Sequence, residues 1–504
     1  YKRQAPSGAA VPGVSPGAGV RTIPAIATDT DQIIVRLNQA AAVSQGMMSA
    51  TRIGTASPNA VAMSRLSAVA GNNLRFKRGA ALGAHILKLD KKKSIEEVRA
   101  IARKLAADSG MVEFAEADVR MFPLAVTPND EFFAAYQWHY RGAPEHGMNL
   151  TEGWEYSTGS PDIVVAVLDT GLHYDHPDLD PTRLLPGYDM LSDLFQANDG
   201  DGRDSDPVDP GDWVTAQESA DNPGCPVTNS TLHGTHVAGT IGAATNNSSG
   251  VAGVDWNAKI LPVRVLGKCG GYVSDIGDGI LWAAGLPVPG VPQNPNPADV
   301  INLSLGGQGN CEQSYYNSVI NSAHAAGVTI VAAAGNAAGP TSNIMPANCP
   351  NVITVAAHRN DGTLSGYSNY GADVDIMAPG GDNGGFCTGE QVVSLGMLGE
   401  RSPEAYAYLC YTGTSMAAPH VAGLVSLMLS IDPDLTPDQL ADLVRNNSRP
   451  FVAGDRCPGL GCGAGIADAG LVLQAVTDQL VIDSDGDGVT DDLDAFPNDP
   501  TEWE

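Results

Sequence analysis

Short, wholly apolar runs recur between residues 140 and 475, and segments long enough to form helices separate them. Runs this short are typical of strands that are buried on both faces. Such strands occur in parallel sheets that carry helices on each side. The alternation therefore predicts an α/β fold with a doubly wound, mostly parallel sheet. The clearest predicted strands are 163–168, 260–265, 300–303, 328–333 and 352–356.

A different pattern precedes this region, from about residue 31 to residue 119. Its periodicity changes in the order strand, helix, strand, strand, helix, strand, which is typical of a small ferredoxin-like α+β domain. Ser94 and Glu97 have the capping-box spacing and predict the start of the second helix. The predicted strands are 32–37, 74–77, 84–89 and 111–119, and the predicted helices are about 57–69 and 98–107.

Composition divides the chain into four parts. Residues 1–30, rich in Ala, Pro, Gly and Thr, are expected to form a flexible leader. The small domain then covers 31–125, the large domain covers 126–477, and an acidic tail covers 478–504. No run of 18 apolar residues occurs, so we expect no membrane span. The sequence starts at Tyr1, and we expect that a signal peptide has been left out of it.

Charge is distributed unevenly along the chain. The formal net charge is -29, yet residues 1–125 contain 17 Lys and Arg against 9 Asp and Glu, whereas the rest contains 11 against 48. A basic small domain beside an acidic body suggests electrostatic complementarity, although an acidic surface that favours solubility would explain part of the excess. The acidic body argues against nucleic acid as a partner, because phosphate contacts need basic side chains.

All eight cysteines lie in the acidic part, and no Cys-x-x-Cys pair occurs. An even number without this spacing favours disulfides in an oxidising compartment over a zinc site. Eight cysteines allow 105 connectivities. Among them we expect pairing between sequence neighbours, namely Cys225–Cys269, Cys311–Cys349, Cys387–Cys410 and Cys457–Cys462.

Three polar side chains stand at positions suited to nucleophilic catalysis. Asp169 ends the first predicted strand, and the carboxyl edge of a parallel sheet commonly forms a site. His233 opens a helix of small residues. Ser415 starts another helix, where backbone amides favour developing negative charge. Because a serine hydroxyl needs a base and the base needs an acid, this set predicts acyl transfer.

Each of these residues also has a simpler explanation. Asp169 could end a strand at a turn, and Ser415 could cap a helix. His233 and His236 could share a metal ion, but no His-Glu-x-x-His motif or third nearby ligand supports that interpretation. The occurrence of all three motifs in one chain favours catalysis.

The chain resembles the subtilisin-like serine proteases over roughly residues 128–475. The resemblance rests on three stretches: Ile163-Val-Val-Ala-Val-Leu-Asp-Thr-Gly171, His233-Gly-Thr-His-Val-Ala-Gly-Thr240 and Gly413-Thr-Ser-Met-Ala-Ala-Pro-His-Val-Ala-Gly423. The order Asp, His, Ser is also that of subtilisin. The resemblance implies that Asp169 is the acid, His233 the base and Ser415 the nucleophile, with His236 packed beneath the base.

The same resemblance implies an oxyanion hole and a specificity pocket. Asn336 matches the family's oxyanion-hole asparagine, which acts with the backbone N–H of Ser415. Segments 304–307 and 332–335 match the two pocket walls, and their small neutral residues imply a broad preference for large apolar side chains. Segment 344–347, near the pocket floor, matches poorly. The residues expected to bind substrate are Ser304, Leu305, Gly306, Gly307, Ala333 and Gly335.

Calcium is the cofactor that the resemblance implies, since calcium prefers oxygen ligands from loops of this kind. An Asx-rich turn is the alternative for the first site, and a solvated acidic loop is the alternative for the third. The first site would use the side chains of Asp130, Asp178 and Asn247 with the carbonyls of Thr245, Ser249 and Val251; the second Asp375 with the carbonyls of Pro350 and Val352; and the third, in a long insertion at 189–232, Asp199, Asp201, Asp204, Asp206 and Asp209.

The acidic tail carries a further calcium pattern. Its spacing fits an EF-hand loop with Gly488 at position six, and the stretch that follows, from Phe496, makes it resemble a thrombospondin type 3 repeat. The expected ligands are Asp483, Asp485, Asp487, Asp491 and Asp494.

The small domain lies directly before the protease-like body, which resembles the placement of a subtilase prodomain. The resemblance implies an intramolecular chaperone and inhibitor, cut from the body between about residues 120 and 127. We therefore expect a secreted, self-processing serine endopeptidase that acts on proteins and peptides as a monomer. The alternatives are a catalytically silent adhesion or matrix-binding protein and a peptide ligase or cyclase.

Overall fold

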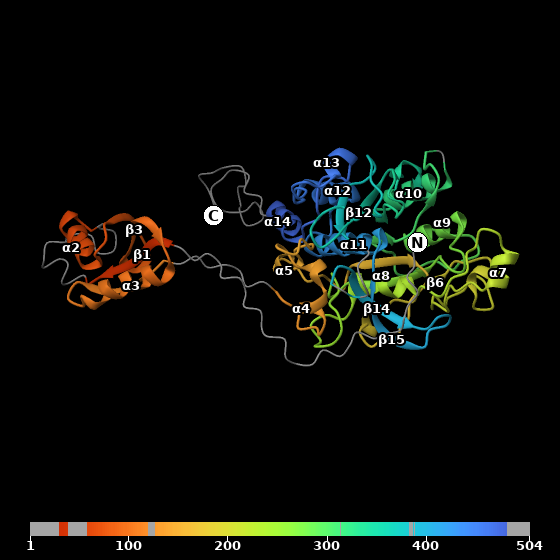
Figure 1. The fold of residues 1–504 in the computed structure, drawn as a ribbon, viewed down its shortest axis with the longest axis horizontal. Coiled ribbons are helices and arrows are strands. Elements are labelled where there is room, and N and C mark those ends of the chain that lie inside the picture. The colour runs from red at the N-terminus through yellow and green to blue at the C-terminus, as the bar shows by residue number, and fades with distance from the viewer. Residues whose placement is uncertain are drawn as a thin grey trace. The chain divides into compact units, whose positions relative to one another are not determined.

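The computed structural model describes residues 30–38, 58–118, 126–312, 314–382, 387 and 389–480. These residues divide into two compact units, a smaller one within Val14–Leu124 and a larger one that contains Ala125–Glu504. Figure 1 shows the helices and strands of each unit, with labels where there is room. The predicted tail ligands, Asp483 to Asp494, lie outside the described residues.

The smaller unit is an antiparallel sheet with strand order β2-β3-β1-β4. Its elements follow the predicted order, and the capping box of Ser94 and Glu97 is present at the second helix. Ile33, Leu87 and Leu105 are fully buried in its core. The elements are β1 (Thr30–Leu37), α2 (Ala60–Ala70), β2 (Leu74–Gly79), β3 (Ala84–Lys93), α3 (Ile95–Ala107) and β4 (Val112–Ala117).

The larger unit is built on a seven-stranded sheet with the order β13-β12-β10-β8-β5-β7-β6. Every strand pair in it is parallel, which confirms the predicted doubly wound α/β fold. The strands of this sheet are β5 (Val164–Asp169), β6 (Tyr188–Asp189), β7 (Lys259–Arg264), β8 (Val300–Leu303), β10 (Thr329–Ala333), β12 (Val352–His358) and β13 (Ile376–Pro379). Short pairs outside it are β9 (Gly307–Gln308) with β11 (Ile344–Met345), and β14 (Val392–Leu398) with β15 (Ala405–Tyr411).

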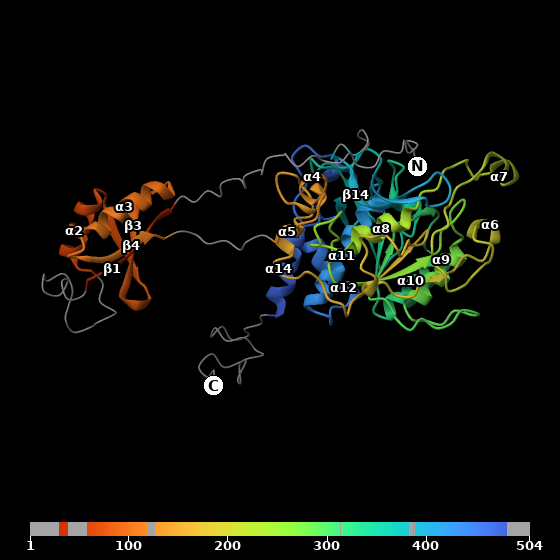
Figure 2. The same ribbon diagram turned by 90° about the horizontal axis from the view of Figure 1, so that it is seen from below.

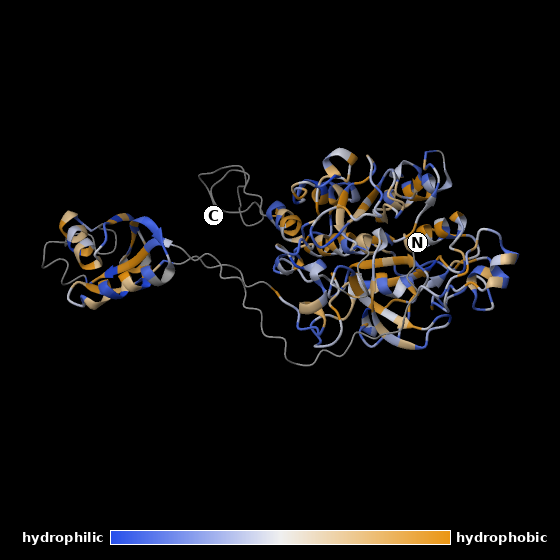
Figure 3. Ribbon diagram, viewed as in Figure 1, coloured by the Kyte–Doolittle hydropathy of each residue, from blue (hydrophilic) through white to orange (hydrophobic). Residues whose placement is uncertain are grey.

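Helices cover both faces of this sheet, because successive strand residues point to opposite sides. On β5, Val165 and Val167 pack with α8 and α11, whereas Ala166 and Leu168 pack with α9 and α10. Figure 2 shows the same unit from a second direction, and Figure 3 shows hydrophobic residues concentrated in the central strands. The helices are α4 (Phe133–Tyr136), α5 (Leu150–Gly153), α6 (Leu194–Ala197), α7 (Ala216–Asp221), α8 (His233–Gly242), α9 (Val273–Ala283), α10 (Tyr315–Ala325), α11 (Thr414–Ile431), α12 (Pro437–Asn446), α13 (Cys457–Leu460) and α14 (Ala469–Leu480).

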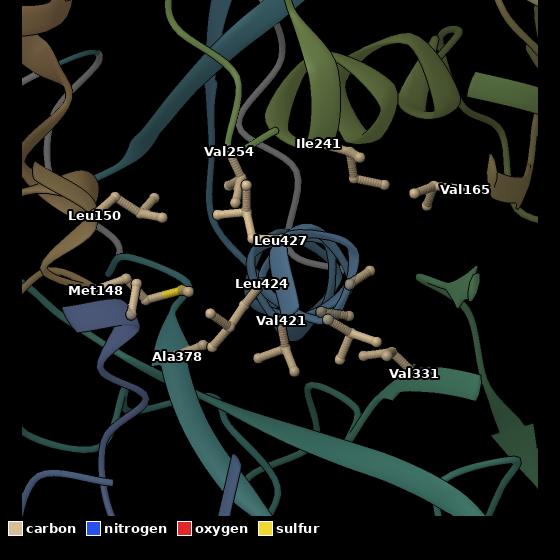
Figure 4. Close-up of a cluster of buried hydrophobic side chains, with 14 of the residues drawn as sticks. Met148, Leu150, Val165, Ile241, Val254, Val331, Ala378, Val421, Leu424 and Leu427 are labelled. Atoms are coloured by element: carbon tan, nitrogen blue, oxygen red, sulfur yellow. The ribbon is translucent and has the colours of Figure 1, made fainter. Parts of the chain in front are cut away.

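Helix α11 runs through the centre of the core. Figure 4 shows Val421, Leu424 and Leu427 of this helix among side chains from the surrounding strands and helices. The helix is long and apolar enough to cross a membrane by length and composition, but 89% of it is buried inside the unit. It is therefore the core helix of a globular domain, and its small residues allow close approach to α8 and the sheet.

The four disulfides join the sequence neighbours that we predicted: Cys225–Cys269, Cys311–Cys349, Cys387–Cys410 and Cys457–Cys462. Cys225–Cys269 fixes the long insertion to the loop that follows β7. The insertion itself contains little regular structure apart from α6 and α7.

Candidate active site

An acid and a base meet where β5 ends and α8 begins. Asp169 is the last residue of β5, and His233 is the first residue of α8. His233 Nδ1 lies 2.8 Å from Asp169 Oδ1 and 2.9 Å from Oδ2. Both side chains are buried, and Asp169 also accepts a hydrogen bond from the backbone N–H of Thr170 at 2.7 Å. The carboxylate therefore holds the imidazole with Nδ1 toward the sheet.

The other ring nitrogen of His233 does not take part in the contact with Asp169. His233 Nε2 is buried and has no hydrogen-bond partner among the described residues. Ser415 lies in the first turn of α11, and α11 packs against α8. The Ser415 Oγ donates to the carbonyl oxygen of Ser304 at 3.2 Å, and the Ser304 hydroxyl donates to the Ser415 carbonyl at 2.7 Å. Ser304 therefore braces the segment that carries the predicted nucleophile.

The surroundings of His233 favour its charged form. Burial by itself would lower the pKa of His233, but the neighbouring carboxylates outweigh burial and raise the pKa above its ordinary value. Asp169 contributes most of the rise, and Asp212 and Asp209 add to it. A base in this setting readily accepts a proton, as acyl transfer requires.

His236, three residues further along α8, lies in a different environment. Its ring stacks on Tyr411 with centroids 4.4 Å apart, and its Nε2 lies 3.1 Å from the carbonyl oxygen of Leu409. Burial lowers the pKa of His236 to about 3, so the ring is neutral. The two histidines have separate protein partners, and in the described residues no group of three or more His, Cys, Asp or Glu could hold a metal ion.

Asn336 lies beside the start of α11 with its amide oriented by the protein. Its Oδ1 accepts hydrogen bonds from the backbone N–H and the hydroxyl of Thr414, both at 2.9 Å. This arrangement leaves Nδ2 pointing away from Thr414, next to Gly413. The backbone N–H of Ser415 lies in the first helical turn, where amides have no partner within the helix. Both donors lie close to Gly413: a Cβ on this glycine would be 3.5 Å from Asn336 Nδ2 and 3.6 Å from the Ser415 nitrogen.

The predicted pocket walls lie on either side of Ile344, which belongs to the segment near the pocket floor that matches the family poorly. A Cβ added to Gly306 would lie 3.4 Å from Ile344 Cγ2, and a Cβ added to Gly335 would lie 3.5 Å from the same atom. Gly307 pairs with Met345 in the β9–β11 ladder. Leu305 is half-buried, Gly306 and Gly307 are exposed, and Ser304 and Ala333 are buried. An isoleucine thus stands between the two glycine-lined segments.

The first predicted calcium site brings its side chains together. Asp178 accepts from the Asn247 amide at 2.8 Å and from the Val251 N–H at 2.9 Å, and Asp130 accepts from the Asn246 N–H at 2.8 Å. Burial raises the pKa of both carboxyls, that of Asp178 to about 6, and the nearby Asp130 adds to this rise.

The residues of this first site fit a calcium ion. Asp130 and Asp178 are buried next to each other, and neither has a Lys or Arg partner in the part of the chain that the structure describes. The loop 245–251 lies against both acids, since its N–H groups donate to them. Two buried acids without a counter-charge provide the oxygen ligands that calcium prefers.

The second predicted site contains a protein cation instead. Asp375 Oδ1 accepts from the Arg445 guanidinium at 2.8 Å, and its Oδ2 accepts from the Thr354 N–H at 2.8 Å. The negative charge of Asp375 is therefore compensated by Arg445, unlike the charges of Asp130 and Asp178. Arg445 is 70 residues away in sequence, and no local pattern indicated it.

The five insertion acids do not come together either, because each has other partners. Asp199 pairs with Arg264 at 2.5 Å, and Asp209 accepts from the Thr170 hydroxyl at 2.5 Å. Asp204 and Asp206 accept from backbone N–H groups two residues ahead, and Asp201 is exposed. Among the described residues the five acids thus do not form the predicted third cluster, and Asp209 belongs to the surroundings of the active site.

Comparisons with known proteins agree with this geometry. Residues 160–479 match the subtilase family. An extracellular protease of Xanthomonas campestris pv. campestris is 45% identical over 399 residues, which cover 79% of this chain and 65% of that protein. An extracellular basic protease of Dichelobacter nodosus is 42% identical over 418 residues, covering 81% of this chain and 65% of that protein. The chain thus spans slightly less than two thirds of the length of these relatives.

A solved structure supports the same fold. A protease from Pseudoalteromonas arctica superposes with a TM-score of 0.65 at 48% identity, covering 70% of this chain and 100% of that one. The family match covers more than half of the sequence and contains Asp169, His233 and Ser415. With the parallel sheet and the buried acid–base pair in place, the chain belongs to the subtilase family.

Proposed function

We propose that this protein is a secreted serine endopeptidase with Ser415 as nucleophile, His233 as general base and Asp169 as orienting acid. The observation that carries the proposal is the buried Asp169–His233 pair, whose Nε2 has no partner among the described residues. The relatives named as extracellular proteases support secretion.

In this mechanism Ser415 Oγ turns from the Ser304 carbonyl toward His233 when a substrate binds. Such hydrogen bonds are often formed only in the substrate complex. His233 accepts the hydroxyl proton while Oγ attacks the peptide carbonyl, then donates that proton to the leaving amine. Water attacks the resulting acyl-enzyme by the same route and releases the acid product.

The negative charge that develops on the carbonyl oxygen would be stabilised by Asn336 Nδ2 and the Ser415 N–H. Thr414 holds the Asn336 amide in place before substrate arrives, so little reorganisation is needed. Removing such a donor typically lowers turnover about 10²–10³-fold.

A preference for large apolar side chains is supported by the chemistry of the pocket walls. Segments 304–307 and 332–335 carry no charged side chain, and Ile344 adds an apolar group between them. A basic substrate side chain would find no acidic partner in these segments. Cleavage of a peptide library, with the residue before the cut bond read by mass spectrometry, tests this preference.

We further propose that the smaller unit, within residues 31–125, is a prodomain that assists folding of the body at 126–477 and inhibits it. Its element order, its basic charge and its position before the protease body support this role. The bond that is cut would lie between about residues 120 and 127. The tail at 478–504 would bind calcium through its aspartates.

The deciding experiment follows intact mass and casein cleavage over time in calcium, for the parent chain beside Ser415→Ala. We expect the parent to lose about 125 N-terminal residues and gain activity, while the variant stays whole. A fluorophosphonate probe should label the parent at Ser415. An unlabelled, inactive parent would instead indicate a catalytically silent binding protein on the same fold.

Calcium would be held at the first site by Asp130, Asp178 and the 245–251 loop, where it would neutralise the two acids. A ligand at 100 times its dissociation constant stabilises a protein by about 2.7 kcal/mol. We expect EGTA to lower the melting temperature of the parent. Asp178→Asn should remove most of this dependence, whereas Asp375→Asn, at the carboxylate paired with Arg445, should keep it.

A further inference from the structure

We infer that the insertion at 189–232 completes the active site, with Asp209 and Asp212 acting as positioning residues for the Asp169–His233 pair. The inference deepens the proposed function and rests on it. Neither carboxylate touches the reacting atoms. Each is hydrogen-bonded to a threonine near a catalytic residue: Asp209 to Thr170, which follows Asp169, and Asp212 to Thr231, two residues before His233.

Asp209 connects the residues that follow the acid and the base. Its Oδ2 accepts from the Thr170 hydroxyl at 2.5 Å, and the same hydroxyl oxygen accepts from the Gly234 N–H at 3.0 Å. Thr170 follows Asp169, and Gly234 follows His233. Asp209 is only 1% exposed, and its Oδ1 accepts from the Gly211 N–H at 2.8 Å. The contacts thus fix both halves of the catalytic pair to one buried carboxylate.

The backbone of the insertion also lies directly against the turn after Asp169. Pro207 accepts a hydrogen bond from the Leu172 N–H at 3.0 Å. Gly171 has a φ of +112°, and a Cβ on it would lie 2.5 Å from the Pro207 carbonyl oxygen. The turn therefore needs glycine both for its conformation and for this close approach.

Asp212 fixes the segment that leads into His233. It accepts hydrogen bonds from the backbone N–H and the hydroxyl of Thr231, the latter at 2.9 Å. The next residue, Leu232, has a φ of +48°, a conformation that costs energy for any residue except glycine. The Asp212 contacts hold this turn, so that His233 enters α8 in the orientation that faces Asp169.

The insertion is fastened to the body at several points, so these contacts are held in place. The Cys225–Cys269 disulfide joins it to the loop after β7. Lys268 of that loop is buried, pairs with Glu218 at 2.5 Å and lies 4.6 Å from the centre of the Trp213 ring.

The titratable groups that face His233 come from three elements. Asp169 lies on β5, Asp209 and Asp212 lie on the insertion, and His236 lies on α8 itself. The three acids favour the imidazolium, and His236 is held neutral by burial. Removing one acid should therefore make His233 easier to deprotonate.

The test measures kcat and KM for a peptide p-nitroanilide from pH 5 to 10, together with melting temperature, on protein expressed as the full chain and then activated. We expect Asp209→Ala to lower kcat about 10–100-fold with little change in KM, because small displacements of a catalytic group have effects of this size. Thr170→Val should do the same. The double variant should be no worse than either single variant if Asp209 acts through Thr170.

Two further variants separate positioning from overall stability. Asp209→Asn keeps an acceptor for Thr170 and should retain most of kcat. Asp212→Asn removes a charge near His233 and should move the acidic limb of the kcat/KM profile to lower pH, so that a larger share of the maximal rate survives at pH 6. Asp206→Asn, an exposed residue of the same insertion, is the control and should match the parent.

The inference is overturned if Asp209→Ala leaves kcat unchanged, if Asp206→Asn lowers kcat equally, or if Asp212→Asn lowers the melting temperature without moving the acidic limb. Ser415→Ala, measured alongside, distinguishes a failure of the proposed triad from a failure of the role given to the insertion. Residual activity in that variant would refute the proposed triad itself. An inactive Ser415→Ala beside a fully active Asp209→Ala would refute only the role of the insertion.

Discussion

The active site and the interior behind helix α8 both bury histidines, yet the pKa values of these histidines shift in opposite directions. In the active site, His233 faces the carboxylates of Asp169, Asp212 and Asp209, which raise its pKa despite burial. In the interior, His236 meets the Tyr411 ring and a carbonyl oxygen, and burial lowers its pKa to about 3. Burial is similar for both rings, so the charged partners decide which of them can accept a proton.

The interior histidines form a connected group, His139, His236, His358 and His420. His139 Nδ1 lies 2.8 Å from His420 Nε2, and burial lowers the pKa of all four rings, that of His420 to about 4 and that of His358 to about 3. A neutral ring packs like an aromatic side chain with one donor and one acceptor. These rings therefore stabilise the fold, whereas the His233 ring has the acidic neighbours that the proposed base requires.

The largest expected effect is a loss of activity when the active-site histidine is removed. His233→Ala should lower kcat about 10⁶-fold, because a lost base is as severe as a lost nucleophile in such a triad. Circular dichroism and a melting curve should show a folded protein. If the variant keeps more than a thousandth of the parental rate, His233 is not the base.

The next largest expected effect is a loss of stability when an interior histidine is removed. His236→Ala removes a buried ring that stacks on Tyr411 and bonds to Leu409, and should cost about 2–4 kcal/mol of unfolding free energy. Urea denaturation measures this loss beside His233→Ala. A larger loss for His233→Ala than for His236→Ala would reverse the comparison.

Lowering the pH should destabilise the protein through the interior histidines. A histidine with a lowered pKa adds stability above about pH 6.5, its unfolded value, and this stability is lost as the pH falls toward 3 to 4. Melting temperatures should therefore fall between pH 6.5 and 4. His358→Asn, which keeps a donor for the Arg359 carbonyl but cannot be protonated, should flatten this dependence. His324→Asn, at the surface pair with Asp438, is the control that should not change it.

The smallest effect concerns Tyr411, which touches both regions. Its ring stacks on His236, and its hydroxyl donates to the Thr231 carbonyl at 2.8 Å, two residues before His233. Tyr411→Phe keeps the ring and removes one hydrogen bond, so we expect a loss of about 1 kcal/mol in stability. Urea denaturation and kcat should both be measured. A greater than tenfold fall in kcat would mean that the interior orients the base more strongly than Asp212 does.

The sequence predicted the features that depend on local pattern. The run at 163–168 predicted β5, and its polar end correctly placed Asp169 at the carboxyl edge of the sheet. Ser94 and Glu97 predicted a helix start because a capping box needs only three residues of spacing. The cysteine pairs were also predicted correctly, with every partner within 44 residues.

The calcium ligands could not be singled out from the sequence, because a carboxylate has the same appearance in the sequence whatever compensates its charge. Asp375 and Asp199 were expected to bind calcium, and their charges are met by Arg445 and Arg264. These arginines are 70 and 65 residues away. Asp130 and Asp178 found no such cation among the described residues, and only the folded arrangement distinguishes the two cases.

The sequence by itself determined the parallel sheet, the three motifs that contain Asp169, His233 and Ser415, and the disulfide pairs, because apolar period, motif and spacing are written along the chain. The tertiary structure alone decided which groups surround them. It placed Asp209 and Asp212 of an irregular insertion behind the Asp169–His233 pair, and Ile344 between the pocket walls. The pKa of a buried group depends on charges a few ångströms away, and chain folding brings those charges close from distant positions in the sequence.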